Sequence, residues 1–337
     1  MSYFRTFAGL VVALLLLLSN VSGSAAPLRL TLTQPVDSLT FFQVYVGRTL
    51  GYFRDEGIAL KVVATAGGGP HLQAVLAGQA QFTASPGTYQ LNALKAGKRL
   101  VGVYDLLNRN IIGVVIHKAV AQRLGVTPTA PLAEKLEKLR GLTLGVTRPG
   151  ALTYIMAEAL IKRAGYVPNK DVRILAVGGG ATIVPALQHR KVDVIFISTP
   201  HPERAIIGGF GQWFINNARG EDPSLDPFMM STLMVTPQYA NDHPQVVRKM
   251  VRALHRATQY ILQHALEEVV RTVEPFFGDK LPPDILREAV RTVQAAVSHD
   301  GRMQPQAVQN TVRLMHGAGR LQRTFTLDDV FTDRFLP

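Results

Sequence analysis

One stretch of the chain joins a short apolar segment, a turn and a helix start in a way that could bind an anion. The run Leu142–Val146 is apolar and bounded by glycines, which predicts a buried strand of a parallel sheet. Thr147–Gly150 contains a proline and a glycine and is typical of a turn. Tyr154–Gly165 has the pattern of a helix that ends at a glycine. Because the first N–H groups of a helix lack partners within it and attract negative charge, we expect this turn to form half of a ligand clamp.

The sequence contains no recognisable catalytic or metal-binding motif. Ser85 and Ser198 lack the Gly-x-Ser-x-Gly pattern of a hydrolase, and the glycine triplets 67–69 and 178–180 lack the spacing of a dinucleotide-binding loop. The chain has no cysteine, which excludes disulfides, thiolate metal sites and cysteine nucleophiles. We therefore expect no catalytic residue, no metal ion and no cofactor. Five histidines lack a partner at ligand spacing and fit surface or capping positions better: His71, His117, His189, His201 and His264.

Strands and helices alternate twice along the chain, which predicts doubly wound sheets. Similar segments flank both glycine triplets, so we expect two look-alike α/β lobes with a cleft between them. Strands in the first half are predicted at 28–33, 58–65 and 80–84, with helices at 41–50, 71–76 and 88–96. Strands in the second half are predicted at 142–146, 173–177 and 192–197, with helices at 154–165 and ending near residue 189.

Two further apolar segments, 110–117 and 228–235, are interpreted as strands that form the two crossings between the lobes. They divide the chain into a discontinuous lobe I, residues 27–110 and 230–337, and a continuous lobe II, residues 111–229. Tyr104, Asp105 and Asn108 follow a predicted strand near the first crossing, where they either line the cleft or pack inside. Helices are expected at 244–264, 266–277, 283–297 and 305–318, and an extended tail at 323–337 is expected to lie on lobe I.

The first 26 residues have the features of a signal peptide. Arg5 supplies a positive charge, Leu10–Leu18 is an apolar run, and Ser22–Ala26 offers small residues for cleavage. The run is shorter than the about 20 residues that span a bilayer, which argues against the alternative of an uncleaved anchor. Because a lipoprotein anchor needs a cysteine, we expect a freely diffusing periplasmic protein that is neither membrane-embedded nor a lipoprotein.

The chain is basic, with 36 Lys and Arg against 24 Asp and Glu and a formal charge of +12. Nucleic-acid binding would explain such a charge, but export and the even spread of basic residues argue against that partner. The excess charge could instead raise the local concentration of anions near a cleft. The densest basic group recurs at helical spacing and is interpreted as one solvated helix face: Arg248, Lys249, Arg252, His255 and Arg256.

Several segments, in this order, resemble one known family. They are Gly51–Ile58, Gly67–Gly69, Leu76–Gln79 through Pro86, Gly141–Gly150, Val177–Gly180, Ser198–Pro200 and Asp300–Arg302. The chain resembles the periplasmic solute-binding proteins of ABC importers for nitrate, sulfonates and taurine, including proteins similar to thiamine-pyrimidine binders. The resemblance implies a two-lobed α/β fold of the type II periplasmic-binding-protein kind, with a ligand cleft between the lobes. It also implies a monomer that delivers its ligand to a permease and its ATPase.

By position, the resemblance implies ligand contacts from four turns. The sequence departs from the common pattern at Arg148, which replaces a small residue, and at Ala151, which replaces a Ser or Thr. Arg148 could grip a carboxylate, sulfonate or phosphate in a two-point contact, or could point to solvent or a lid. We expect Ser38, Ser85, Gly150 and Ser198 to face one hollow. The implied ligand-binding residues are Ser38, Leu39 and Thr40; Ser85, Pro86 and Gly87; Thr147, Arg148, Pro149, Gly150, Ala151 and Leu152; and Ser198 and Thr199.

These features favour a solute-binding protein that captures a small anionic or polar organic molecule, similar to a sulfonate, nitrate or taurine, by lobe closure. Two alternatives stay open. An enzyme of the pyrimidine-synthase type could use the same fold, although the export signal and the lack of cysteine weigh against it. An extracytoplasmic sensor module would have a tethered receptor or kinase as its partner in place of a permease.

Overall fold

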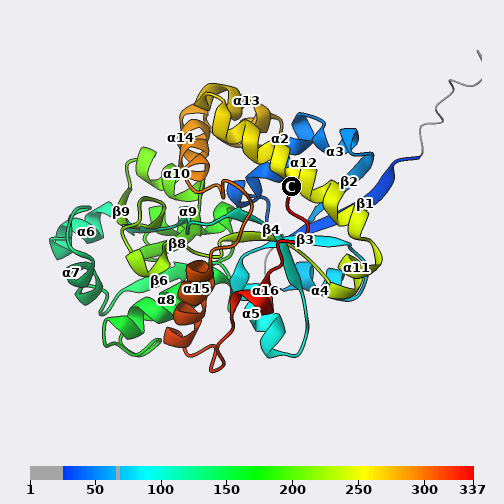
Figure 1. Cartoon of the computed structure of the whole chain (residues 1–337). Helices are drawn as coiled ribbons and strands as arrows, with labels where there is room; N and C mark the ends of the chain where they lie inside the picture. Colours follow the sequence, from blue (N-terminus) through cyan, green and yellow to red (C-terminus); the bar gives the residue numbers. More distant parts are fainter. Residues whose placement is uncertain (1–25, 66–68) are drawn as a thin grey trace, which may run out of the picture.

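The computed structural model describes residues 26–65 and 69–337, arranged around two five-stranded sheets (Figure 1). The predicted signal peptide and the first two glycines of the triplet 67–69 lie outside the described residues.

The first sheet has the strand order β2-β1-β3-β10-β4. β1 pairs in parallel with β2 and with β3, whereas β10 pairs antiparallel with both β3 and β4. The sheet is therefore mixed, with β10 as its reversed strand. Its strands are β1 (Leu28–Gln34), β2 (Ile58–Ala64), β3 (Phe82–Ser85), β4 (Val101–Leu107) and β10 (Ser231–Val235).

The second sheet repeats this arrangement in the order β7-β6-β8-β5-β9. β6 pairs in parallel with β7 and β8, and β5 is antiparallel to both β8 and β9. The strand predicted at Leu142–Val146 corresponds to β6, which is parallel to both of its neighbours, as expected. The strands are β5 (Ile112–His117), β6 (Thr143–Val146), β7 (Arg173–Ala176), β8 (Val194–Ser198) and β9 (Gly211–Asn216).

The predicted fold class of two α/β lobes is confirmed, with one refinement of strand direction. Each sheet contains one antiparallel strand, β5 or β10, and that strand is the first one after the chain has crossed from the other sheet. Because the chain arrives at this strand from the other sheet, the strand is antiparallel to both of its neighbours. The sequence places Tyr104 and Asp105 after a strand, but β4 runs from Val101 to Leu107 and contains both of them. Strand β9 was not predicted. The lobe boundaries at 110/111 and 229/230 remain a prediction.

Helices cover both sheets (Figure 1), and the four long C-terminal ones begin where the sequence predicts. Helices that accompany the first sheet, together with the C-terminal ones, are α2 (Phe42–Thr49), α3 (Tyr52–Asp55), α4 (Pro70–Leu76), α5 (Gly87–Lys95), α11 (Pro237–Asp242), α12 (Pro244–Gln263), α13 (Leu266–Phe277), α14 (Pro283–Gln294), α15 (Pro305–Gly317) and α16 (Leu327–Val330). Those of the second sheet are α6 (Lys118–Leu124), α7 (Leu132–Glu137), α8 (Leu152–Arg163), α9 (Gly180–Gln188) and α10 (His201–Ile207). Short 3-10 turns are η2 (Leu39–Phe41), η3 (Asn217–Arg219), η4 (Pro223–Leu225) and η5 (Gly278–Lys280).

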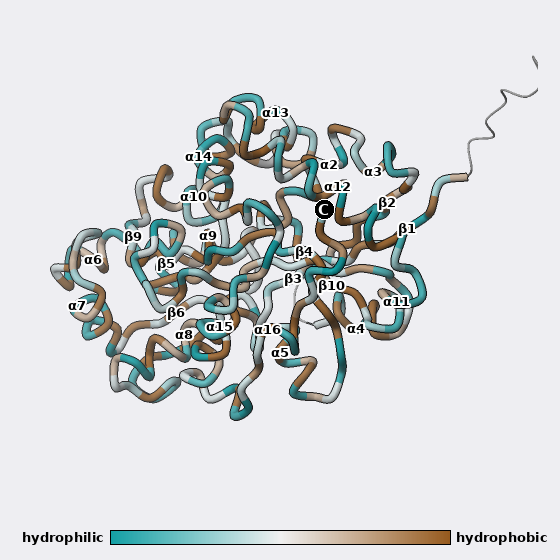
Figure 2. The backbone as a smooth tube through the Cα atoms, in the orientation of Figure 1, coloured by the Kyte–Doolittle hydropathy of each residue, from teal (hydrophilic) through white to brown (hydrophobic). Residues whose placement is uncertain are grey.

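Helix α12 shows how an outer helix packs. Val247, Met250, Val251 and Leu254 are fully buried, and their spacing places them on one face of the helix. Figure 2 shows the corresponding alternation of apolar and polar residues along the outer helices. The opposite face carries the basic group, which forms ion pairs with α3.

The basic face of α12 is largely paired within the molecule. Arg252 makes a two-point contact with Glu56, with a shortest distance of 2.6 Å, and Arg256 lies 2.9 Å from Asp55. Arg248 lies over the ring of Phe335 in the C-terminal tail. Arg252 and Arg256 remain 45% and 44% exposed, which agrees with the predicted solvated helix face, and their ion pairs also join that face to the segment around α3.

The C-terminal segment ties the two parts of the molecule together. Phe331 forms a bridge with Gly102 of β4, so the tail lies on the first sheet as expected, although it also contains the unpredicted helix α16. Helix α15 packs against both α5 and α8, which accompany different sheets. Beyond α15, Arg320 binds Glu158 of α8 through two hydrogen bonds of 2.6 Å. These contacts fix the position of α8.

Asp105 of β4 is a carboxyl group buried without a cationic partner. It is fully inaccessible to solvent and lies opposite Thr232 of β10. Burial, together with the nearby charge of Asp300, raises its pKa well above the ordinary value. Folding therefore favours the protonated form of the Asp105 carboxyl.

This burial predicts that Asp105→Asn stabilises the protein at neutral pH. A carboxyl whose pKa is raised by folding binds a proton more tightly in the folded chain, so stability falls as the pH rises from about 4 through the raised pKa. The amide keeps the shape and cannot ionise, so we expect the free energy of unfolding at pH 7 to rise by about 1 kcal/mol or more. Urea unfolding between pH 4 and 8 measures this.

The exposed Asp242→Asn on α11 is the control and should leave the pH profile unchanged. A profile for Asp105→Asn that runs parallel to that of the wild type would show that Asp105 does not hold its proton in the folded state.

Candidate functional site

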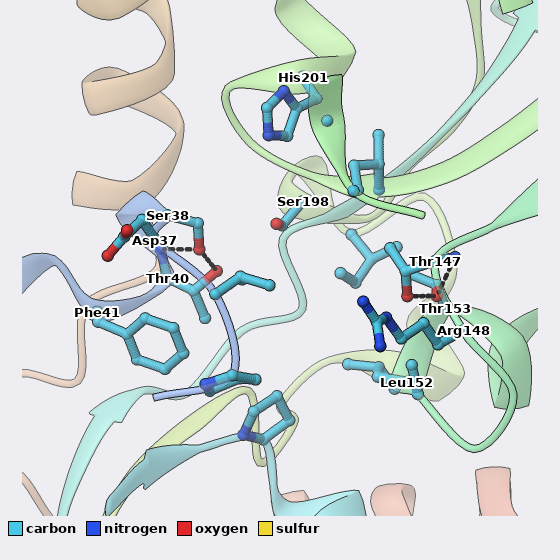
Figure 3. A pocket seen from close by; sticks show the side chains of 18 of the residues that line it. Asp37, Ser38, Thr40, Phe41, Thr147, Arg148, Leu152, Thr153, Ser198 and His201 are labelled. Atoms are coloured by element: carbon cyan, nitrogen blue, oxygen red, sulfur yellow. Dashed lines mark hydrogen bonds between the residues drawn. The ribbon is translucent and has the colours of Figure 1, made fainter. Parts of the chain in front are cut away.

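A cavity of about 290 Å³ lies between the two sheets and takes its walls from both. Its residues follow the carboxyl ends of the parallel strands β1, β3, β6, β7 and β8 (Figure 3). The antiparallel strands also reach it, because Ile112 begins β5 and Met230 precedes β10. In α/β sheets this edge is where ligands bind.

Several helices begin at the wall of this cavity. Ser38, Pro86, Ala151 and Gly179 are the N-cap residues of η2, α5, α8 and α9, and His201 is the first residue of α10; all of them line the cavity. Helix starts present N–H groups without intrahelical partners and carry partial positive charge. Their convergence makes the cavity suited to an anionic or hydrogen-bond-accepting ligand.

The turn before α8 is fixed by two threonines. The Thr147 backbone N–H donates to Thr153 Oγ1 at 3.2 Å, and the two hydroxyl oxygens lie 2.7 Å apart. Gly150 has a φ of 77°, a left-handed conformation that favours glycine. This arrangement holds Arg148 at the cavity wall, and Figure 3 shows its guanidinium extending toward the opposite lobe.

The opposite wall is built on the turn after β1. Ser38 Oγ donates to Thr40 Oγ1 at 2.9 Å and accepts from the Thr40 backbone N–H at 3.2 Å. Asp37 also reaches the cavity, but its carboxylate accepts hydrogen bonds from Gln34 at 3.0 Å and Tyr45 at 3.4 Å. In Figure 3 that carboxylate lies on the far side of Ser38, away from Arg148. Arg148 is thus the charged side chain directed into the cavity among the described residues.

The structure brings together eight of the fourteen predicted site residues. Those that line the cavity are Ser38, Thr40, Pro86, Thr147, Arg148, Ala151, Leu152 and Ser198. Those that do not are Leu39, Ser85, Gly87, Pro149, Gly150 and Thr199. Of the four residues expected to face one hollow, Ser38 and Ser198 do so, whereas Ser85 and Gly150 do not. Contact with a ligand remains a prediction for every one of them.

The residues outside the cavity have other surroundings. Leu39 and Thr199 are fully buried, and Ser85 Oγ lies 2.8 Å from His71 Nε2 inside the first lobe. Gly87 approaches Met229 so closely that a Cβ atom would overlap its side chain. Pro149 and Gly150 form the outer part of the turn, where Pro149 is exposed.

Tyr89 and His201 line the cavity although the sequence did not assign them to the site. Tyr89 follows Pro86 by three residues, a helical spacing that places both on one side of the α5 start. His201 was interpreted as a surface or capping residue, but its ring lies against Gly180, where a Cβ atom would overlap the imidazole. The glycine is therefore needed for the ring to reach the cavity.

Burial sets the protonation states of these two side chains. It lowers the pKa of His201 to about 4, with a further contribution from Arg204. It raises the pKa of Tyr89 to about 12, an effect that the nearby charge of Arg148 partly offsets. At neutral pH the imidazole is uncharged and the phenol is protonated, so the cavity keeps a single directed cation.

Within residues 26–65 and 69–337, no group of three or more His, Asp or Glu side chains could hold a metal ion. In that same part of the chain, no helix is both long and apolar enough to span a lipid bilayer.

The chain belongs to the NMT1/THI5-like family, whose model matches residues 39–268, more than half of the chain. YtlA of Bacillus subtilis (strain 168), named as a proposed binding protein, is 19% identical over 255 residues, covering 75% of this chain and 72% of the relative.

Solved structures share the fold. A protein from Bordetella bronchiseptica RB50 is 19% identical, with a TM-score of 0.75 over 93% of this chain and 96% of that one. The alkanesulfonate-binding protein SsuA from Xanthomonas axonopodis pv. citri, solved with MOPS, is 16% identical, with a TM-score of 0.67 over 91% and 98%. The enzyme DSZB, solved as a mutant with biphenyl-2-sulfinic acid, is also 16% identical, with a TM-score of 0.61 over 91% and 97%.

The lowered pKa of His201 predicts a pH-dependent loss of stability. The unfolded chain binds a proton at this residue below about pH 6.5, whereas the folded chain does so only near pH 4. Stability should therefore decline as the pH falls from 6.5 to 4, and His201→Gln should remove that part of the decline. Urea unfolding at pH 4.5 and pH 7 provides the comparison.

The exposed His316→Gln on α15 is the matched control and should retain the full decline. If His201→Gln and His316→Gln lose stability equally on acidification, then His201 is not held neutral by the fold.

Proposed function

We propose that this protein is the solute-binding component of an ABC importer that captures a small organic anion by closure of its two lobes. The observation that carries the proposal is the arrangement of Arg148 and converging helix starts in one cavity between the sheets. A ligand that touches both walls favours the closed form, because it binds that form more tightly than the open one. Membership of a family with a relative named as a binding protein supports this function.

The cavity lining favours an anion with an apolar body over a bare inorganic ion. Apart from the hydroxyl groups and Arg148, much of the wall is apolar, including Val36, Phe41, Ile112 and Met230. An apolar part of a ligand that covers these side chains lowers the free energy of the complex, because it removes their surface from water. Nitrate has no apolar part that could pack against them. Alkanesulfonates and alkyl or aryl carboxylates have the required combination, and the structural likeness to an alkanesulfonate-binding protein agrees with that class.

Export and delivery complete the proposal. The predicted signal peptide at residues 1–26 would place the mature chain in the periplasm, without a lipid anchor. There it would act as a monomer that passes its ligand to a membrane permease driven by an ATPase. This role requires no covalent step, since the protein only binds the ligand and releases it to the permease.

An enzymatic function is the second candidate, because DSZB has the same fold. In the present cavity Ser198 and His201 both line the wall, but no hydrogen bond joins them in the described part of the chain. Turnover of a bound ligand, seen as a new product by mass spectrometry, would favour this candidate over transport.

The proposal predicts that Arg148→Gln weakens the binding of organic anions. Charge-assisted hydrogen bonds contribute about 1.5–3 kcal/mol, so we expect a loss of affinity of about tenfold to a hundredfold. Isothermal titration with 1-butanesulfonate, benzenesulfonate, butyrate and nitrate measures the effect, and ligand-induced shifts in melting temperature give an independent check. The uncharged butanesulfonamide should bind wild type and variant alike.

Arg123→Gln, at an exposed position of α6 outside the cavity, is the control and should bind as the wild type does. If none of the anions binds the wild type, or if nitrate binds more tightly than 1-butanesulfonate, then the proposed ligand class is wrong.

A further inference from the structure

Tyr89 and Arg148 approach the same cavity from different sheets. Tyr89 lies in the first turn of α5, after β3, whereas Arg148 lies in the turn between β6 and α8. They are close enough for the charge of Arg148 to act on the tyrosine hydroxyl, since it lowers the pKa that burial raises. A hydrogen-bond donor and a cation therefore face one space from opposite walls.

The Tyr89 hydroxyl has no hydrogen-bond partner among the described residues. The hydroxyl oxygen is not among the fully buried polar atoms of the described residues, so it is open to the cavity while the side chain is half-buried in the cavity wall. A ligand oxygen can therefore replace water as the partner of this hydroxyl.

The ring of Tyr89 is held from behind by a buried polar pair. His71 packs edge-on against it, with ring centroids 4.8 Å apart and an interplanar angle of 84°. His71 Nε2 lies 2.8 Å from Ser85 Oγ, and both residues are fully buried. The backbone of His71 is fixed as well, since its carbonyl accepts from Thr33 Oγ1 at 2.8 Å.

We propose that Tyr89 and Arg148 grip the anionic group of the ligand from opposite lobes, and that Ser85 acts through His71 as a positioning residue for Tyr89. This inference rests on the proposed function and makes it more specific. The anionic group must offer at least two acceptor oxygens, one toward each donor, as a sulfonate or carboxylate does. Since the two donors belong to different lobes, the same group that is recognised also draws the lobes together.

This assignment gives Ser85 a different role from the one implied by the family resemblance. Its hydroxyl does not reach the cavity, so it cannot touch a ligand held there. Its effect on binding would instead pass through the placement of the tyrosine ring.

The first test is Tyr89→Phe, which removes the hydroxyl and keeps the ring. With 1-butanesulfonate as the probe, we expect the affinity measured by titration calorimetry to fall about tenfold, the loss of one hydrogen bond to a charged group. Tyr239→Phe is the matched control, because that ring packs on Phe82 outside the cavity. It should bind as the wild type does, and unliganded melting temperatures verify that each variant is folded.

The second test separates positioning from general stability by a double-variant cycle. Ser85→Ala should lower the affinity for 1-butanesulfonate about threefold to tenfold in the wild type, yet have no further effect in the Tyr89→Phe protein. A merely structural role would lower the affinity equally in both backgrounds, which would overturn the positioning assignment.

The outcomes also separate this inference from the proposed function. If Arg148→Gln loses binding while Tyr89→Phe stays within twofold of the wild type, then the two-lobe grip is wrong and organic-anion binding stands. If the wild type binds none of the anionic probes, both are wrong.

Discussion

The carboxyl ends of the parallel strands in both sheets face one space, and the rest of the structure depends on that constraint. At this edge the chain leaves each strand and turns into a helix, so the first N–H groups of several helices point into the gap without partners of their own. Residues after β1, β3, β6, β7 and β8 therefore all meet at one cavity. A ligand with acceptor oxygens can satisfy these donors better than an apolar side chain could, which is why we propose this cavity as the binding site.

Two features of chain path keep the two edges facing each other. The reversed strands β5 and β10 each follow a crossing, so each sheet is entered from the side of its partner. Helix α15 packs on α5 and on α8, and the Arg320–Glu158 pair holds the middle of α8. Tyr89 lies in the first turn of α5, and Arg148 lies in the turn before α8. Both helices are thus supported by the same C-terminal segment. Its packing couples the geometry of the two walls.

The sequence could predict the alternation of elements and the turns that carry the site, because both are local patterns. The apolar run before Thr147, the proline and the glycine all indicate the strand, turn and helix start that the structure contains. Side-chain direction was harder to predict. Ser85 ends β3 and points toward α4, whereas the cavity begins one residue later at Pro86. Neither the approach of His201 over Gly180 nor the pairing of Asp105 with Thr232 follows from local sequence, since each depends on how distant elements pack.

The distribution of charge in the cavity is the basis of the proposed preference for anions. Burial keeps His201 neutral and Tyr89 protonated, and the carboxylate of Asp37 is turned toward Gln34 and Tyr45. Arg148 is left as the charge directed into the cavity among the described residues, and its guanidinium is exposed and so accessible to an anion that enters from solvent. A ligand cation would meet no matching carboxylate there and would lose its hydration. A neutral ligand would leave the guanidinium without a counter-charge, and this is the reason we propose an anion as the ligand.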